Sequence, residues 1–256
     1  MYLYTNAIFS SSVDAVIPFS DDYSFEYDGV NDSVSIGTTS LGITSAISVS
    51  AWVKIPTSNT GGGGANIQMI VCEDTTSSGQ RNWGLSWRGT GSNYFSFQIW
   101  HTNSTNTSIN STGITPNDGQ WHHLLGTYDG TTSTNGMKFY IDGVLNGQKT
   151  ATSTGINSFS SSEPTIGAKT NGTARILEGN IDEAAVWNSD QNANISTIYG
   201  PGVPTDISSL SPLGHWRAEN STWNGSVWSV TDSGSGGNNG TSSGMTLSSR
   251  STDVPT

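Results

Sequence analysis

Hydrophobic and polar residues alternate along much of the chain, a pattern that predicts β-strands. The clearest case is the segment ISVSAWVKI at residues 47–55, in which every second residue is apolar. Shorter runs of the same kind recur, separated by segments rich in Gly, Ser, Asn or Asp, at 23–27, 33–36, 67–72, 83–87, 94–101, 121–130 and 136–143. Short strands at such regular spacing predict an all-β antiparallel sandwich.

An Asp-Gly pair follows two of these runs. Asp28-Gly29 comes directly after the first run, and Asp142-Gly143 ends the last one. Asp-Gly beside alternating apolar residues is a strong turn signal, so both positions predict β-hairpins. Residues 102–113 are almost all Asn, Ser and Thr, which suits an edge strand or a loop.

One short helix is predicted, over residues 191–199. Its apolar residues share one face, Asp190 precedes it as a candidate N-terminal cap, and the segment GPG at 200–202 ends it.

The chain divides into a lead-in over 1–22, a sandwich over 23–200 and an extension over 201–256. Within the extension, residues 213–217 predict a further strand. Its large aromatic residues are too many for a solvated linker: Trp216, Trp223 and Trp228. Because the segment is too short to bury a core of its own, we expect it to dock on the sandwich or to serve assembly.

Composition narrows the possible partners. Of 256 residues only 11% are charged and 32% are hydrophobic, while 31 Gly and 24 aromatic residues (9 Trp, 8 Tyr and 7 Phe) fit a sheet protein with long loops. The net charge of −11, with only 9 basic residues, argues against binding nucleic acid through its phosphates. No run approaches the roughly 20 apolar residues of a membrane span, so we expect no membrane insertion.

Cys72 is the only cysteine, so no disulfide can form within the chain, and we expect a buried structural thiol. The first residues, MYLYTN, show neither a basic region nor a long apolar stretch. This predicts synthesis in a cytoplasm without a signal peptide, and an extracellular role would then need another exit route, such as lysis of a host.

The segments that carry these patterns resemble the laminin-G/pentraxin-like jelly roll of the concanavalin A-like superfamily. The most specific are WHHLLGTYDG at 121–130 and GMKFYIDG at 136–143, which are similar to the recurring family signature. Further segments resemble the family pattern in order, at 23–36, 47–54, 164–167 and 177–188. The resemblance implies an antiparallel β-sandwich jelly roll of the lectin/glucanase type, with two sheets of about six to seven strands.

The resemblance also implies a structural calcium ion between the first hairpin and the closing strand. Ca²⁺ prefers carboxylate, carbonyl and amide oxygens. The candidate ligands are Asp182 and the turn residues Asp28, Gly29, Asn31 and Asp32. The alternative is that the turn residues only stabilise the turn and that Asp182 makes a local hydrogen bond.

A carbohydrate surface is a second candidate site, because aromatic rings stack on the apolar faces of sugars. The less constrained aromatic positions are Trp83, Trp87, Tyr94 and Trp100, with His101 beside them. The alternative for these residues is packing or assembly.

Glycoside hydrolysis is the enzymatic rival. It needs two carboxylates that flank one sugar, and the hydrolase motif of the superfamily, E-x-D-x-x-E, is absent. The nearest pairs do not suit the reaction, since Glu26 and Asp28 run into a turn while Glu73 and Asp74 are adjacent and point to opposite faces of a strand. We therefore expect no enzymatic activity.

Together these features favour a non-enzymatic virion component of a bacteriophage, a capsid decoration or fibre protein with a lectin-like surface. The assignment to a virion is what the resemblance of this chain to bacteriophage structural proteins implies. We expect partners among other virion proteins, further copies of this chain and host surface glycans. The alternatives are a secreted or cell-surface carbohydrate-binding module and, third, a glycoside hydrolase.

Overall fold

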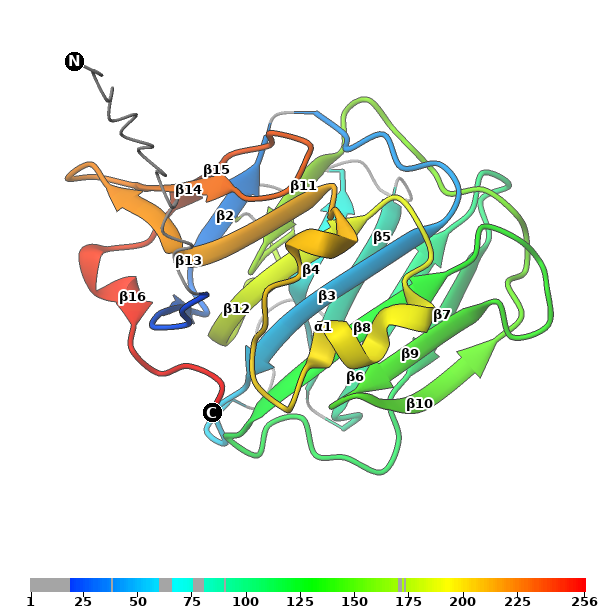
Figure 1. Ribbon diagram of the computed structural model, residues 1–256, viewed down its shortest axis with the longest axis horizontal. Coiled ribbons are helices and arrows are strands. Elements are labelled where there is room, and N and C mark those ends of the chain that lie inside the picture. The colour runs from blue at the N-terminus through cyan, green and yellow to red at the C-terminus, as the bar shows by residue number, and fades with distance from the viewer. Residues whose placement is uncertain are drawn as a thin grey trace, which may run out of the picture.

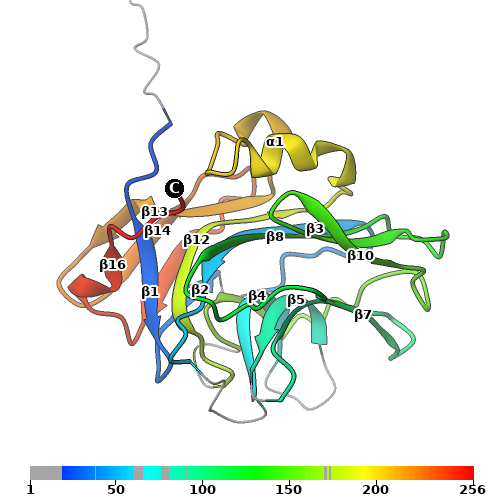
Figure 2. The same cartoon turned by 90° about the horizontal axis from the view of Figure 1, so that it is seen from below.

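The computed structural model describes residues 19–37, 39–59, 66–75, 81–89, 91–169, 172 and 174–256. These residues form two packed antiparallel sheets (Figures 1 and 2). In spatial order, the first sheet contains β10 (Val144–Lys149), β9 (Met137–Ile141), β8 (Trp121–Tyr128), β3 (Ile47–Lys54) and β12 (Glu178–Trp187). The second contains β2 (Ser33–Ile36), β11 (Glu163–Ile166), β4 (Ile67–Asp74), β5 (Arg81–Arg88), β6 (Tyr94–Trp100) and β7 (Asn106–Asn110). The all-β antiparallel sandwich predicted from the alternating pattern is confirmed.

Inward-facing side chains of both sheets form one large hydrophobic core. Trp87 of β5 and Phe95 and Phe97 of β6 are fully buried, and the Phe97 ring lies 6.4 Å from the ring of Phe139 in β9. Full burial of one such side chain stabilises the fold by about 1.5–3 kcal/mol. The large apolar residues that share one face of each strand therefore turn that face toward the core.

A smaller core covers the outer face of the first sheet. The helix α1 (Ile195–Tyr199) and the short 3₁₀ turns Asn192–Asn194 and Ser208–Leu210 lie over it (Figure 2). Ile198 of α1 and Ile207, just before the second turn, are buried there. They pack against apolar side chains of β8, β9 and β12: Leu125, Tyr140, Ala185 and Trp187. Within the described ranges, no helix has the length and apolar character needed to cross a lipid bilayer.

The C-terminal extension joins the two sheets. It supplies β13 (Gly214–Trp223), β14 (Trp228–Asp232) and β15 (Gly240–Ser243), and β13 pairs with β12 while β15 pairs with β2 (Figure 1). Trp216, Trp228 and Val230 enter the main core. The extension therefore docks on its own sandwich and closes one side of it.

A β-bulge interrupts the closing strand β12. The strand β1 (Ser24–Asp28) pairs with its first half and β13 with its second half, on the same side of β12. Between these halves the register against β3 shifts at Asp182, and Glu183 adopts a positive φ of 49°. A short strand β16 (Arg250–Ser251) pairs with the other edge of β1. The bulge thus lies where the lead-in, the closing strand and the extension meet.

Candidate functional site

Four carboxylates gather at the bulge of β12. One oxygen each from Asp21, Asp182, Glu183 and Glu219 lies within 4.8 Å of the others. We call this group the acidic cluster. It joins the lead-in before β1, the closing strand and β13 of the extension, which are far apart in the sequence.

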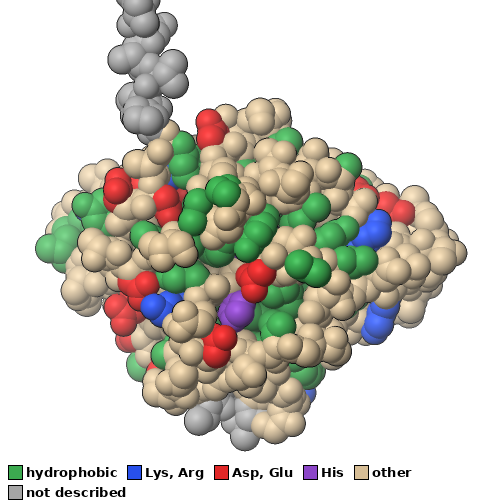
Figure 3. All heavy atoms as spheres, turned by 60° about the horizontal axis from the view of Figure 1, so that its bottom comes forward, with side chains coloured by type: hydrophobic (Ala, Val, Ile, Leu, Met, Phe, Trp, Pro, Cys, Tyr) green, Lys and Arg blue, Asp and Glu red, His purple; other side chains and the backbone are tan. Residues whose placement is uncertain are grey.

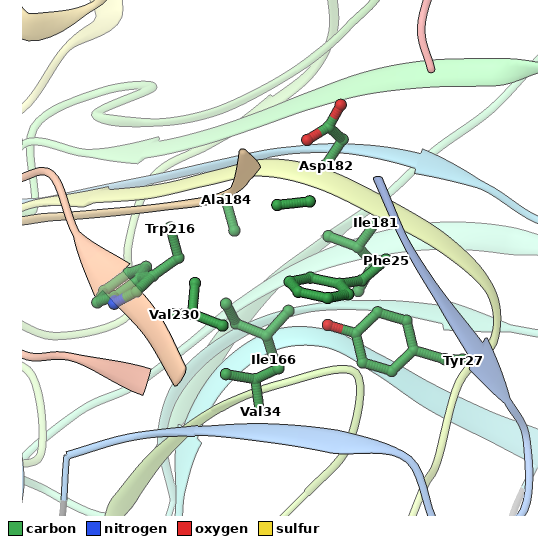
Figure 4. Close-up of a pocket in the computed structure, with 10 residues that line it drawn as sticks. Phe25, Tyr27, Val34, Ile166, Ile181, Asp182, Ala184, Trp216 and Val230 are labelled. Carbon is green, nitrogen blue, oxygen red and sulfur yellow. The ribbon is translucent and has the colours of Figure 1, made fainter. Parts of the chain in front are cut away.

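The bulge explains how two neighbouring residues contribute to one cluster. In a regular strand, successive side chains point to opposite faces. The positive φ of Glu183 breaks this alternation. Such a conformation is strained for a non-glycine residue and is found preferentially at functional sites. Figure 4 shows Asp182 above a layer of apolar side chains, with its carboxylate directed away from Ile166 and Val34.

Three of the four carboxylates have partners, and that of Asp182 is the Glu183 N–H, which donates to Asp182 Oδ1 at 2.8 Å. His215 Nε2 lies 2.6 Å from Glu183 Oε2, and Arg217 Nε lies 2.5 Å from Glu183 Oε1. Glu219 Oε1 accepts hydrogen bonds from the backbone N–H groups of Asp22 and Tyr23 at 2.8 and 2.7 Å. Glu219 therefore fixes the start of β1.

The remaining carboxylate oxygens face mainly one another. Burial raises the pKa of Asp182 well above its usual range, and the charges of Glu183 and Asp21 add to this effect. Burial also raises the pKa of Asp21, to about 6. The cluster thus carries more negative charge than its surroundings compensate, and a proton or a cation would relieve it.

The structure does not bring Asp182 together with the predicted calcium turn. In the β1–β12 register Asp28 faces Glu178 and Phe25 faces Ile181, so Asp182 lies at the end of β1 opposite to Asp28. Four residues of strand correspond to about 13 Å. The single site expected from Asp182 and the first hairpin is therefore not formed.

The hairpin itself has its own network. Asp28 Oδ1 accepts hydrogen bonds from the N–H groups of Val30 and Asn31 at 2.8 and 3.2 Å, and Asp32 Oδ2 accepts one from Asp28 N–H at 3.2 Å. Gly29 has a positive φ of 76°, and a Cβ there would lie 2.9 Å from Glu178 Cβ. These contacts fit the turn-stabilising alternative for Asp28, Gly29, Asn31 and Asp32.

Three of the five predicted sugar-contacting residues are buried. Trp83 is 3% exposed, and Trp87 and His101 are fully buried. Trp87 donates a hydrogen bond from Nε1 to Asn93 Oδ1, while His101 bonds to Gly155 O and Thr107 Oγ1. Because a buried ring cannot stack on a sugar, the prediction was wrong for Trp83, Trp87 and His101.

Tyr94 and Trp100 lie on the outer face of the second sheet. Their neighbours Phe95, Phe97 and Ile99 point into the core, so the alternate residues of β6 point outward. The β6–β7 register places hydroxyl and amide side chains beside them: Ser96 opposite Asn110, Gln98 opposite Ser108 and Trp100 opposite Asn106. This polar face is a row of uncharged side chains between two partly exposed aromatic rings, within which Ser96 is only 2% exposed.

Two contacts involve side chains of the polar face among the described residues. Ser96 Oγ donates to Asn110 Oδ1 at 2.9 Å, and the Arg81 guanidinium lies 5.3 Å from the centroid of the Trp100 ring. The face of the molecule drawn in Figure 3 shows mainly uncharged side chains and backbone, with scattered acidic groups and few basic ones.

Sequence reasoning identified Asp182 but missed Asp21, Glu183 and Glu219. The neighbouring acids Asp182 and Glu183 are visible in the sequence, but regular strand geometry separates them. Only the bulge and the pairing of β12 with both β1 and β13 bring the four groups together. No pattern in the sequence alone predicts that arrangement.

Comparison with known proteins fits this architecture. A laminin G-type family described as the concanavalin A-like lectin/glucanases superfamily matches residues 28–194. The chain belongs to this superfamily. No curated protein matches the chain by sequence.

Solved structures share the fold at low sequence identity. A candidate carbohydrate-binding protein from Bacteroides ovatus matches with a TM-score of 0.61 and 17% identity, over 90% of this chain and 60% of that protein. This chain therefore spans less than two thirds of that protein. A heptameric pentraxin from Limulus polyphemus matches with a TM-score of 0.50 and 17% identity, over 69% of this chain and 81% of the pentraxin. At this identity the matches establish the lectin-like fold.

Proposed function

We propose that the chain is a non-enzymatic carbohydrate-binding domain that contacts glycans through the polar face of β6 and β7. The observation that carries this proposal is the row of uncharged side chains between Tyr94 and Trp100, on a chain of a lectin superfamily. The fold neighbour from Bacteroides ovatus, itself a candidate carbohydrate-binding protein, supports the same class of ligand.

The chemistry of this face suits sugars. Amide and hydroxyl groups both donate and accept hydrogen bonds, as sugar hydroxyls require. Tyrosine and tryptophan combine an apolar ring with a polar atom. The residues follow two neighbouring strands and lie along one face, which favours an extended glycan over a small molecule held in a closed pocket.

The same face does not suit glycoside hydrolysis. That reaction needs two carboxylates on either side of the scissile bond. The outward residues of β6 and β7 are Tyr94, Ser96, Gln98, Trp100, Asn106, Ser108 and Asn110, and none of them is acidic. We therefore propose binding without cleavage at this surface.

Replacing Trp100 with alanine should weaken glycan binding by about tenfold, a loss of about 1.4 kcal/mol. The reason is that the substitution removes an aromatic surface at one end of the polar face. Binding partners are first found by screening the purified chain on a glycan array, and the affinity of each hit is then measured by isothermal titration calorimetry.

Trp121→Ala is the matched control. Trp121 is also partly buried, but it lies on β8 and donates its Nε1 hydrogen bond to Asp253 Oδ1 at 3.0 Å. The Trp121→Ala variant should bind glycans with the same affinity as the unsubstituted chain. Equal affinities of the Trp100→Ala variant and the unsubstituted chain for every array hit would contradict the proposed surface.

We further propose that this domain is displayed on a bacteriophage particle, as a capsid decoration or fibre component that binds host glycans. Mass spectrometry of purified particles should detect the chain in stoichiometric amount with the other structural proteins. Its absence from particles would contradict the virion role and would favour a secreted or cell-surface module. The glycan-binding proposal would stand in either case.

A further inference from the structure

We propose that the acidic cluster of Asp21, Asp182, Glu183 and Glu219 binds a divalent cation of the calcium class. The ion would join the lead-in, the closing strand and the extension. This site is separate from the polar face of β6 and β7, and the inference does not depend on glycan binding.

The spacing of the four oxygens fits one central ion. Ca²⁺–oxygen bonds are about 2.3–2.6 Å long, so two ligands of the same ion lie at most about 5 Å apart. The carboxylate oxygens of the cluster all lie within 4.8 Å of one another. A set made only of oxygen atoms favours hard cations such as Ca²⁺, Mg²⁺ or Mn²⁺ over zinc, which prefers nitrogen and sulfur ligands.

A second observation points to a ligand. Asp182 is 3% exposed, and no hydrogen-bond donor among the described residues reaches its Oδ2 atom. The same holds for both carboxylate oxygens of Asp21, while Glu219 Oε2 has no hydrogen bond and only the ion pair with Arg217 Nη2 at 3.7 Å. Buried polar atoms almost always have a partner. Here several unpartnered oxygens belong to one cluster, as expected for atoms whose partner is a bound cation.

The charges around the cluster leave room for a cation. Arg217 lies 2.5 Å from Glu183 Oε1 and 3.7 Å from Glu219 Oε2, and its guanidinium also donates to the backbone carbonyl of Ser20. His215 contacts Glu183 only on its other oxygen, Oε2. Arg217 therefore pairs with two of the four carboxylates, and among the described residues no basic side chain forms an ion pair with Asp182 or Asp21.

The strain at Glu183 supports the same conclusion. A positive φ at a non-glycine residue costs of order 1–3 kcal/mol and persists only where the surrounding structure enforces it. This conformation directs two consecutive carboxylates of β12 into one group.

The direct test is calcium titration of the full chain after chelator treatment, by isothermal titration calorimetry and by thermal unfolding. We expect one Ca²⁺ per chain and a rise of the unfolding midpoint, because an ion that binds only the folded state stabilises it by mass action. Magnesium and manganese are titrated in the same way to define selectivity.

Asp182→Asn should weaken Ca²⁺ binding at least about tenfold and remove the midpoint shift. In chelator, the same substitution should raise the midpoint, since it removes a buried charge from a group of like charges. Glu219→Gln, closer to the surface, is a second variant that should also weaken binding. Glycan binding should survive both changes, which separates this test from that of the proposed function.

Asp32→Asn is the matched control. Asp32 is also buried and also has an unpartnered oxygen, but it lies in the first hairpin. The Asp32→Asn variant should bind calcium as the unsubstituted chain does. The proposal is overturned if none of the three cations binds up to millimolar concentration. It is equally overturned if Asp32→Asn abolishes binding while Asp182→Asn leaves it intact.

Discussion

Replacing Trp228 with alanine is expected to lower the free energy of unfolding by about 3–5 kcal/mol. Trp228 lies on β14 of the extension and is 2% exposed. Its ring packs 5.7 Å from the ring of Phe25, and its Nε1 donates a hydrogen bond to Thr246 O at 2.9 Å. The truncation would leave a cavity where the extension closes the sandwich. Urea denaturation measures the loss as a lower midpoint at constant slope.

Trp223→Ala provides the comparison within the same hairpin. Trp223 pairs with Trp228 across β13 and β14, but it is only partly buried. Trp223→Ala should lower the free energy of unfolding by less than half as much as Trp228→Ala, because less buried apolar surface is lost. A loss below about 1 kcal/mol for Trp228→Ala, the size of an average substitution, would mean that the extension contributes little to the core.

The sandwich was predictable because its strands alternate apolar and polar residues. The runs at 47–55, 94–101 and 121–130 appear as β3, β6 and β8. No strand was predicted at β15, whose sequence is Gly-Thr-Ser-Ser. That strand has no apolar residue and is held by pairing with β2 and β14. Such a strand depends on its neighbours, and its own sequence does not indicate it.

The error in the sugar-contacting residues has a specific cause. Alternation shows which residues share a face, but it does not show which face turns inward. Trp83 and Trp87 pair with Ile99 and Phe95, so they belong to the inward set, whereas Tyr94 and Trp100 belong to the outward set. A comparison of the two faces of β6 would have indicated which set turns inward. One face carries Phe95, Phe97 and Ile99, whereas the other carries Ser96 and Gln98.

The acidic cluster could be predicted only in part, for a different reason. Family resemblance singled out Asp182, but it supplied a partner set at the wrong end of β1. The true neighbours, Asp21 and Glu219, come from the lead-in and the extension, and strand register decides their positions. Register over such long sequence separations follows from the whole packed sheet.

Replacing Glu73 with alanine should destabilise the fold by about 3 kcal/mol or more, because buried donors that lose their acceptor each cost about 1–3 kcal/mol. Glu73 is 1% exposed. Its carboxylate accepts hydrogen bonds from Leu41 N–H at 2.9 Å and from Asn82 Nδ2 at 2.5 Å. Ser40 Oγ donates to it at 2.5 Å. Thermal and urea unfolding of the variant measure the loss.

Glu73→Ala also distinguishes a structural role of the Glu73 carboxylate from a catalytic one, with Glu26→Ala as the matched control. Glu26→Ala on β1 removes an exposed carboxylate and should change the free energy of unfolding by no more than about 0.5 kcal/mol. Neither variant nor the unsubstituted chain should release reducing ends from β-glucans, galactans or alginate. A catalytic Glu73 would give the opposite pattern, with stability near that of the unsubstituted chain and loss of a measurable hydrolytic rate. Its carboxylate already meets four donors at 2.5–2.9 Å in a closed environment, the fourth being Ser162 Oγ, so we expect loss of stability instead.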